Sequence, residues 1–266
     1  MLADGAVGSE LIKTGIAPER TVEANVSHVH RVRDIHRRAI AAGAELLTTN
    51  TFGTPSGEGW AAEFHAGVEL AAAAVAEAGR EIAVLLSVYP EELRSNPAVV
   101  LAPFREPETQ GWLLLIETAV DLRAAVEAID LARSHGVTTI AATCHFQADA
   151  RMPDGTLPAQ AAAALQQAGA SIVGANCGTG PEEMVDIAAQ MRAVTDLPLL
   201  FQPNAGLPQW DEDANDWVYS IGPDRFAAAA SALFDIGVAI VGGCCGTTPA
   251  HIAAVHRLLF HPQRRE

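Results

Sequence analysis

The chain of 266 residues lacks any apolar run that approaches the roughly 20 residues of a membrane-spanning helix. Its first residues, MLADGAVGSEL, lack the basic start and the apolar core of a signal peptide, so a cytoplasmic location is expected. Basic residues are scarce, because 17 Lys and Arg stand against 32 Asp and Glu, a formal net charge of −15. Such a charge repels phosphate backbones and anionic lipid. Neither nucleic acid nor a membrane surface is therefore expected as a partner.

Cysteines are also few, and there are four, at positions 144, 177, 244 and 245. A cytoplasmic chain of this length seldom forms disulfides, so thiols that cluster in the sequence indicate a metal site or catalysis. Hydrophobic residues make up 49% of the chain and no long biased tract or linker interrupts it. We expect one globular domain that spans residues 1–266.

Short apolar runs alternate with alanine-rich amphipathic segments along the chain. Most of the runs are continuously apolar, which is typical of parallel strands that are buried on both faces. We expect strands at residues 2–3, 45–50, 81–89, 112–118, 137–145, 170–177, 197–205 and 237–244. Helices are expected at residues 28–42, 61–79, 121–135, 158–168, 181–193, 223–236 and 249–259.

This alternation predicts an α/β fold, a (β/α)8 barrel of the TIM type. The third β/α unit is shortened, since the segment 90–111 carries four prolines and no sustained helical period. We expect a loop there with at most a short helix. An open, doubly wound sheet is the alternative architecture, because it tolerates a missing helix more easily.

The carboxyl ends of barrel strands carry the chemistry of such folds. Cys177 ends the sixth expected strand, and Cys244 and Cys245 end the eighth. One strand lies between these ends, so their backbones are about 10 Å apart and the three side chains can converge. Three thiolates suit zinc and leave one tetrahedral position open, and flanking glycines let the backbone curl toward the metal. The alternatives are a dithiol redox pair and, for Cys144 as well as Cys177, a small core residue.

Six segments, spread along nearly the whole chain, all resemble the same known protein family. They are DGAVGSEL (4–11), AGAELLTTNTFG (42–53), LLLIETAVDLRAAVEA (113–128), GANCGTGPEEM (174–184), PNAGLP (203–208) and VGGCCGTTPAHI (241–252). The chain resembles the homocysteine S-methyltransferase family, which includes the homocysteine-binding module of cobalamin-dependent methionine synthase and the betaine- and S-methylmethionine-dependent enzymes. The resemblance implies a (β/α)8 barrel with a zinc ion (Zn2+) on Cys177, Cys244 and Cys245. Homocysteine sulfur would take the open position and accept a methyl group to give methionine.

The resemblance also implies how the rest of homocysteine is held. It places Asp4 and Glu117 near the substrate ammonium, a cation that would offset the desolvation of a buried carboxylate. Backbone amides of two turns are expected to bind the substrate carboxylate, which makes Gly5, Thr51 and Phe52 binding candidates.

Several features leave the methyl donor open. The family typically has a Gly-Pro turn and a longer helical excursion where this chain has its short segment 90–111. We expect a low rim there and hence a bulky donor, methylcobalamin on a separate corrinoid protein. A small cation such as S-methylmethionine or a betaine is the alternative, with Trp210, Trp217 and Tyr219 as a candidate aromatic cage. A non-catalytic subunit or sensor that binds zinc and a thiol amino acid would keep the same residues. Asn176 and Asn204 are expected to brace loops.

Overall fold

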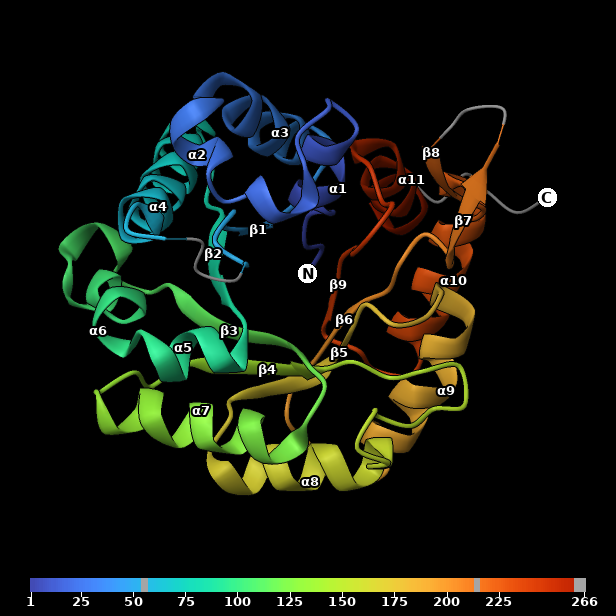
Figure 1. The fold of residues 1–266 in the computed structure, drawn as a ribbon. Helices are drawn as coiled ribbons and strands as arrows, with labels where there is room; N and C mark the ends of the chain where they lie inside the picture. Colours follow the sequence, from blue (N-terminus) through green and yellow to red (C-terminus); the bar gives the residue numbers. More distant parts are fainter. Residues whose placement is uncertain (54–56, 213–215, 261–266) are drawn as a thin grey trace.

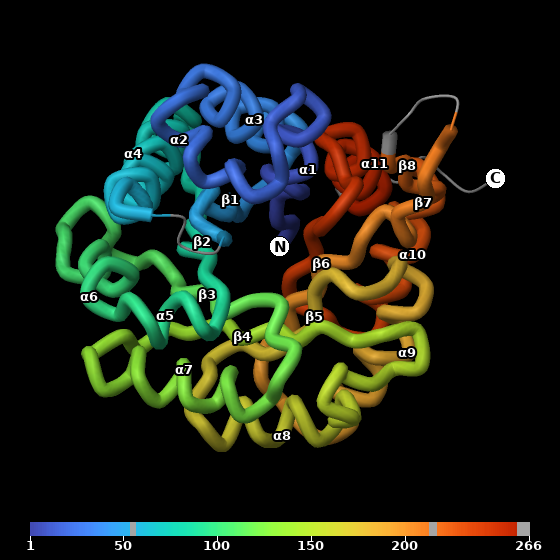
Figure 2. The backbone as a smooth tube through the Cα atoms, in the orientation of Figure 1, coloured from blue at the N-terminus to red at the C-terminus, as the bar shows by residue number. Residues whose placement is uncertain are grey.

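Seven parallel strands form one sheet in the order in which they occur along the chain. They are β1 (Leu46–Thr48), β2 (Ala83–Val88), β3 (Leu113–Ala119), β4 (Ile140–Cys144), β5 (Ile172–Asn176), β6 (Leu199–Gln202) and β9 (Ile240–Val241). The computed structural model describes residues 1–53, 57–212 and 216–260. In Figure 1 the strands form a ring with the helices outside it, and the trace in Figure 2 passes once around that ring from blue to red.

The first residues of the chain close the sheet into a barrel. Leu2 pairs in parallel with Val241 of β9, and Ala3 pairs in parallel with Leu46 of β1. The Ala3 N–H donates to the Val241 carbonyl at 2.8 Å, and the Asp4 N–H donates to the Leu46 carbonyl at 3.0 Å. The predicted (β/α)8 barrel is therefore confirmed. The open, doubly wound alternative is wrong, because that sheet reverses its strand order and has two free edges.

The seven predicted helices all form and cover the outside of the barrel (Figure 1). They are α3 (Val29–Ala41), α4 (Trp60–Glu77), α7 (Leu122–Ser134), α8 (Pro158–Ala168), α9 (Pro181–Arg192), α10 (Pro223–Asp235) and α11 (Pro249–Phe260). Proline begins α8, α9 and α10, where its fixed φ suits the first turn. Gly169 then ends α8 with a φ of 99°, a left-handed conformation that costs glycine little.

Two apolar layers explain why the strands read as continuously apolar. One side chain from each of the seven strands, together with Ala3 from the bridging residues 2–3, forms a cluster inside the barrel: Ala3, Leu46, Leu85, Leu115, Ala141, Ile172, Leu200 and Ile240. Alternate residues of the same strands point outward and join a larger cluster with the helices, in which Phe64, Phe201 and Phe226 are almost fully buried. Both faces of each strand are thus removed from water, as in other closed parallel sheets.

The third β/α unit is short, as predicted, but it is folded. Between β2 and β3 lie α5 (Pro90–Ser95), α6 (Pro97–Val100) and two 3-10 turns, Ala102–Arg105 and Pro107–Thr109. Each of the four prolines of the segment lies in the first turn of one of these elements. Helix α5 packs on α7, and Arg94 pairs with Glu127 of α7 at 2.7 Å. A series of single turns thus takes the place of one long helix.

Sequence analysis missed several short elements. These are α1 (Val7–Ile12), a 3-10 turn (Pro18–Arg20), α2 (Ala24–Ser27) and an antiparallel hairpin of β7 (Pro208–Asp211) and β8 (Asp216–Tyr219). In the hairpin, Trp210 lies opposite Trp217, and their ring centroids are 5.5 Å apart. Elements of three to six residues are too short for a periodic pattern. In the described part of the chain, no helix has the length and apolar character needed to cross a membrane.

Candidate metal centre and substrate cavity

The three cysteines that the sequence singled out converge at the carboxyl ends of β5 and β9. The Sγ atom of Cys245 lies 3.9 Å from that of Cys177 and 4.0 Å from that of Cys244. All three sulfurs lie within 4.8 Å of one another. Tetrahedral zinc with bonds of about 2.3 Å holds two ligand sulfurs about 3.8 Å apart. The three thiols therefore fit a zinc ion.

The local backbone aims these side chains at one point. Cys177 directly follows β5 with a φ of 57°, a left-handed conformation that is uncommon for a residue with a side chain. After Cys244 and Cys245, Gly246 closes the turn with a φ of 79°, and a Cβ atom there would lie 2.1 Å from the ring of Tyr219. Only glycine fits this position, so the glycine beside the cysteine pair is a geometric requirement of the turn.

The three thiols do not titrate alike. Hydrogen bonds from the thiols of Cys244 and Cys245 hold the pKa of Cys177 far below its usual range. The same contact with Cys177 raises the pKa of Cys245 to about 12 and also raises that of Cys244. Three sulfurs this close cannot all be anionic unless a cation lies among them, which is the role a metal ion would fill. Cys144 is different, because it is fully buried in β4, as expected of a core residue.

A cavity of about 240 Å³ opens beside the sulfurs. Its walls include the three cysteines and three of the predicted substrate residues, Gly5, Phe52 and Glu117. Sites for drug-sized ligands span about 300–1,000 Å³, so this cavity suits a smaller molecule such as an amino acid. Metal-ligand candidates and a carboxylate thus share one small chamber.

Two polar side chains hold Glu117 in place. The Ser87 hydroxyl donates to Oε1 of Glu117, and Nδ2 of Asn176 donates to Oε2 at 2.6 Å. Burial raises the pKa of the Glu117 carboxyl to about 7, although these hydrogen bonds oppose the shift. A cation that entered the cavity would favour the ionised carboxylate. Asn176 also accepts the Thr118 N–H at 2.8 Å, so it braces the strand ends, as expected.

Asp4 and Thr51 lie behind the cavity wall, and neither lines the cavity. Asp4 is 1% exposed, and its two oxygens accept the N–H and the hydroxyl of Thr48 at 2.9 and 2.7 Å. Burial raises the pKa of Asp4 to about 7. The Thr51 hydroxyl donates to the Ser87 carbonyl at 2.7 Å. In this structure the two side chains support the frame of the site.

Sequence analysis gave no role to Thr48, Ser87 or Gln202. Gln202 ends β6, lines the cavity and is 5% exposed, and its Oε1 has no hydrogen-bond partner within the residues described. Each of the three is a polar residue near the carboxyl end of an apolar strand. That position is the signal that could have identified them.

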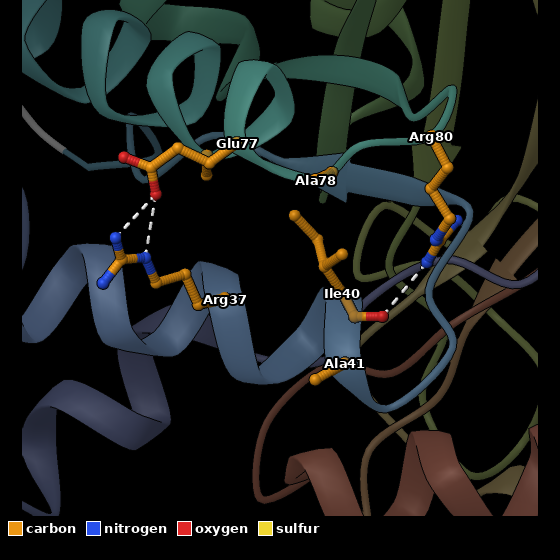
Figure 3. A pocket seen from close by; sticks show the side chains of 7 residues that line it. Arg37, Ile40, Ala41, Glu77, Ala78 and Arg80 are labelled. Atoms are coloured by element: carbon orange, nitrogen blue, oxygen red, sulfur yellow. Dashed lines mark hydrogen bonds and ion pairs between the residues drawn. The ribbon is translucent and has the colours of Figure 1, made fainter.

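A larger hollow of about 550 Å³ lies between the ends of α3 and α4 (Figure 3). Arg37 donates twice to Glu77 there, at 2.9 and 2.7 Å, and Arg80 donates to the Ile40 carbonyl at 3.0 Å. The carboxyl ends of these helices lead into the starts of strands, so the hollow lies at the amino-terminal face of the barrel. That face of a TIM barrel contributes to stability rather than to catalysis.

Fold and site together define a (β/α)8 barrel in which three thiols converge at the carboxyl ends of the strands, close enough to share one metal ion. The family model for homocysteine S-methyltransferase matches residues 1–259, and the chain belongs to this family.

Individual relatives agree with this assignment. The chain is 30% identical to methionine synthase from Mycobacterium tuberculosis over an alignment of 300 positions. This match covers 100% of the chain and 25% of that protein. It is 27% identical to S-methylmethionine–homocysteine S-methyltransferase from Mus musculus, over 88% of the chain and 71% of the relative. The chain thus spans about a quarter of the length of the methionine synthase. The metallated homocysteine methyltransferase of Escherichia coli has the same fold, with a TM-score of 0.76 at 22% identity over 96% of this chain and 94% of that one.

Proposed function

We propose that this chain transfers a methyl group to the sulfur of homocysteine, giving methionine, with a zinc ion held by Cys177, Cys244 and Cys245. The observation that carries this proposal is the convergence of three thiols beside a small cavity that Glu117 also lines. Membership of the homocysteine S-methyltransferase family supports it. We also propose that residues 1–266 act as one homocysteine-binding barrel in the cytoplasm, where reducing conditions keep thiols free for a metal.

Zinc bound at this centre would lower the pKa of the substrate thiol, so that it reacts as a thiolate near neutral pH. The residues of the chain orient the remainder of the substrate. The Glu117 carboxylate pairs with the ammonium group, and the hydrogen bonds from Ser87 and Asn176 hold that carboxylate in one orientation. The backbone near Gly5 and Phe52, which lines the cavity, is left to bind the substrate carboxylate.

The methyl donor belongs to one of two classes. The prediction that a corrinoid protein is the donor depends on a low rim at residues 90–111. Since that segment folds into four short elements, of which α5 packs on α7, the argument for a bulky donor is weaker. Names of relatives include S-methylmethionine and betaine as donors, and we propose a small cation of this kind. The corrinoid partner stays a prediction.

One turnover experiment tests these proposals. The zinc-loaded protein is incubated with homocysteine and, separately, with S-methylmethionine, betaine or a methylcorrinoid protein, and methionine is measured by mass spectrometry. Methionine from any donor supports the methyltransferase, and the donor that works decides between the two classes. Homocysteine binding without methionine from any donor would instead support the non-catalytic subunit or sensor. The Cys177→Ala variant is the inactive control, because two thiolates hold zinc poorly.

A further inference from the structure

The three converging thiols carry more negative charge, once ionised, than one zinc ion balances. Three thiolates outweigh the two positive charges of zinc, and the sulfur of homocysteine would add another negative charge. Among the described residues that line the cavity beside the sulfurs, there is no lysine, arginine or histidine. The excess charge is therefore left to hydrogen-bond donors that lie behind the sulfurs.

Tyr219 lies behind one of these thiols, that of Cys245. It ends the β7–β8 hairpin, and its ring occupies the space in which Gly246, the residue after Cys245, would carry a Cβ atom. The Tyr219 hydroxyl forms a hydrogen bond with Cys245, although Tyr219 does not line the cavity. Burial, together with the charge of the neighbouring thiols, raises the pKa of Tyr219 to about 12. The hydroxyl therefore keeps its proton and donates it toward the sulfur.

His145 has the same relationship with Cys177. It directly follows β4, and its Cε1 atom lies 3.1 Å from the position that a Cβ atom of Gly178, the residue after Cys177, would take. The two neighbouring thiols are the main cause of the low pKa of Cys177, and a hydrogen bond from His145 adds to their effect. His145 also lies outside the cavity wall. A glycine after the cysteine thus lets a ring with a donor approach the sulfur in both places.

The third thiol, that of Cys244, has a donor of its own. Nδ2 of Asn176 donates to Sγ of Cys244 at 4.0 Å. His145, Asn176 and Tyr219 come from three different parts of the fold, namely the end of β4, β5 and the hairpin, and each approaches a different sulfur. Outer groups that orient metal ligands and tune the metal have this arrangement.

We propose that His145 and Tyr219 are positioning residues of the metal centre. The imidazole of His145 donates to the sulfur of Cys177, and the hydroxyl of Tyr219 donates to that of Cys245. This inference rests on the metal centre of the proposed function and adds to it the groups that hold two of its ligands. The donors disperse the negative charge of the thiolates, so that the centre can accept a further thiolate from the substrate. They also fix the direction of each sulfur.

Zinc affinity, measured without homocysteine or a methyl donor, tests this role. Tyr219→Phe and His145→Phe keep a ring against the glycine and remove the donor. We expect each variant to bind zinc about tenfold more weakly than the parent protein in competition with a chromophoric chelator. Tyr89→Phe is the matched control, because Tyr89 is the second of the two tyrosines of the chain and does not line the cavity beside the sulfurs. Its zinc affinity should stay within about twofold of the parent protein.

The absorption spectrum of the cobalt(II)-loaded protein distinguishes a hydrogen bond to sulfur from a general structural effect. Cobalt(II) held by thiolates absorbs through charge transfer from sulfur to metal, and a hydrogen bond on the sulfur raises the energy of this transition. The band should therefore move to longer wavelength in Tyr219→Phe and in His145→Phe. In His145→Gln, which keeps an N–H donor, it should stay closer to the parent position. Tyr89→Phe should leave it unchanged.

These measurements do not depend on methyl transfer. Weaker zinc binding with a shifted cobalt band supports the inference even when no donor yields methionine, an outcome that would reject only the proposed methyl transfer. An unchanged cobalt band in Tyr219→Phe and His145→Phe overturns the inference, whether or not zinc affinity falls, and methionine formation would then leave the proposed function standing. Should His145→Phe fail to fold, Tyr219→Phe decides the outcome, since it removes a single hydroxyl from the same ring.

Discussion

Asn176 donates a hydrogen bond of 2.6 Å to Glu117, although the two residues are 59 positions apart in the chain. Asn176 is the last residue of β5, and Cys177 follows it directly. One buried amide thus joins the carboxylate proposed to hold the substrate ammonium to the backbone of a proposed metal ligand. A displacement of the Glu117 carboxylate would therefore also displace the backbone at Cys177, and the reverse holds as well.

We expect Asn176→Ala to destabilise the protein by about 3 kcal/mol or more, because it leaves several buried polar groups unpaired. The amide bonds to the Thr118 N–H, the Thr143 hydroxyl and Glu117. Urea unfolding measures the effect. Thr143→Val is the matched control, since it removes one of these bonds and should cost about 1 kcal/mol. Equal losses in the two variants would contradict a central role for Asn176.

Glu117→Gln should raise the homocysteine KM more than Asp4→Asn does, because Glu117 lines the cavity and Asp4 lies behind it with both oxygens bonded to Thr48. We expect an increase of about tenfold or more for Glu117→Gln. Zinc content should change little in either variant. Loss of zinc with an unchanged KM in Glu117→Gln would show that the carboxylate supports the metal centre instead of the substrate.

The protein should bind one zinc ion per chain. Elemental analysis of Cys177→Ala, Cys244→Ala and Cys245→Ala should show loss of most of the metal, because each change removes one of three converging thiolates. Cys144→Ala is the control and should keep its zinc, since that thiol is buried in β4. Chelation should lower the thermal midpoint of the parent protein and leave that of Cys177→Ala unchanged. Full zinc content in the three variants would exclude this centre.

The stability of the ligand-free protein should fall as the pH rises through the range in which Glu92 titrates. Burial raises the pKa of Glu92 from 4.5 to about 8, so the unfolded chain gives up this proton before the folded one. Folding therefore loses stability as the pH rises between these two values, by about 1.4 kcal/mol for each unit of pH. Urea unfolding as a function of pH should show a shallower fall for Glu92→Gln.

The same measurement has an internal control. Glu91, Tyr89 and Glu117 also lie near this carboxyl, and the raised pKa of Glu117 contributes in the same direction. Glu91→Gln should leave the slope of the parent protein unchanged, because that side chain is exposed. An identical pH dependence in Glu92→Gln and the parent would mean that Glu92 is ionised in the folded state.

Long elements were predictable from the sequence because local patterns specify them. Helix α8 begins at Pro158 and ends before Gly169, at the bounds that its period and its stop signal predict. The β7–β8 hairpin was missed, since its four-residue strands are stabilised by pairing with each other, as Trp210 does with Trp217. The segment 90–111 was predicted to be short, but its folding against α7 depends on contacts such as Arg94 with Glu127.

The candidate site also has a part that could be predicted from the sequence and a part that could not. The sequence predicted the three cysteines, their glycine neighbours and their positions at the ends of strands. The separation of cavity residues such as Glu117 from frame residues such as Asp4 and Thr51 was not, because side-chain direction at a strand end depends on neighbouring strands. The roles of Ser87 and Gln202 were hidden for the same reason.

The sequence by itself determined the order of strands and helices, the burial of both sheet faces and the three thiols that can hold a metal. Each of these follows from spacing and residue type within one segment. Only the tertiary structure decided that Leu2 pairs with Val241 and Ala3 with Leu46, that Asn176 links Glu117 to Cys177, and that the buried Glu92 lines the same cavity as Phe52. These relationships join residues tens to hundreds of positions apart, and local propensity carries no information about which distant atoms meet when the barrel closes.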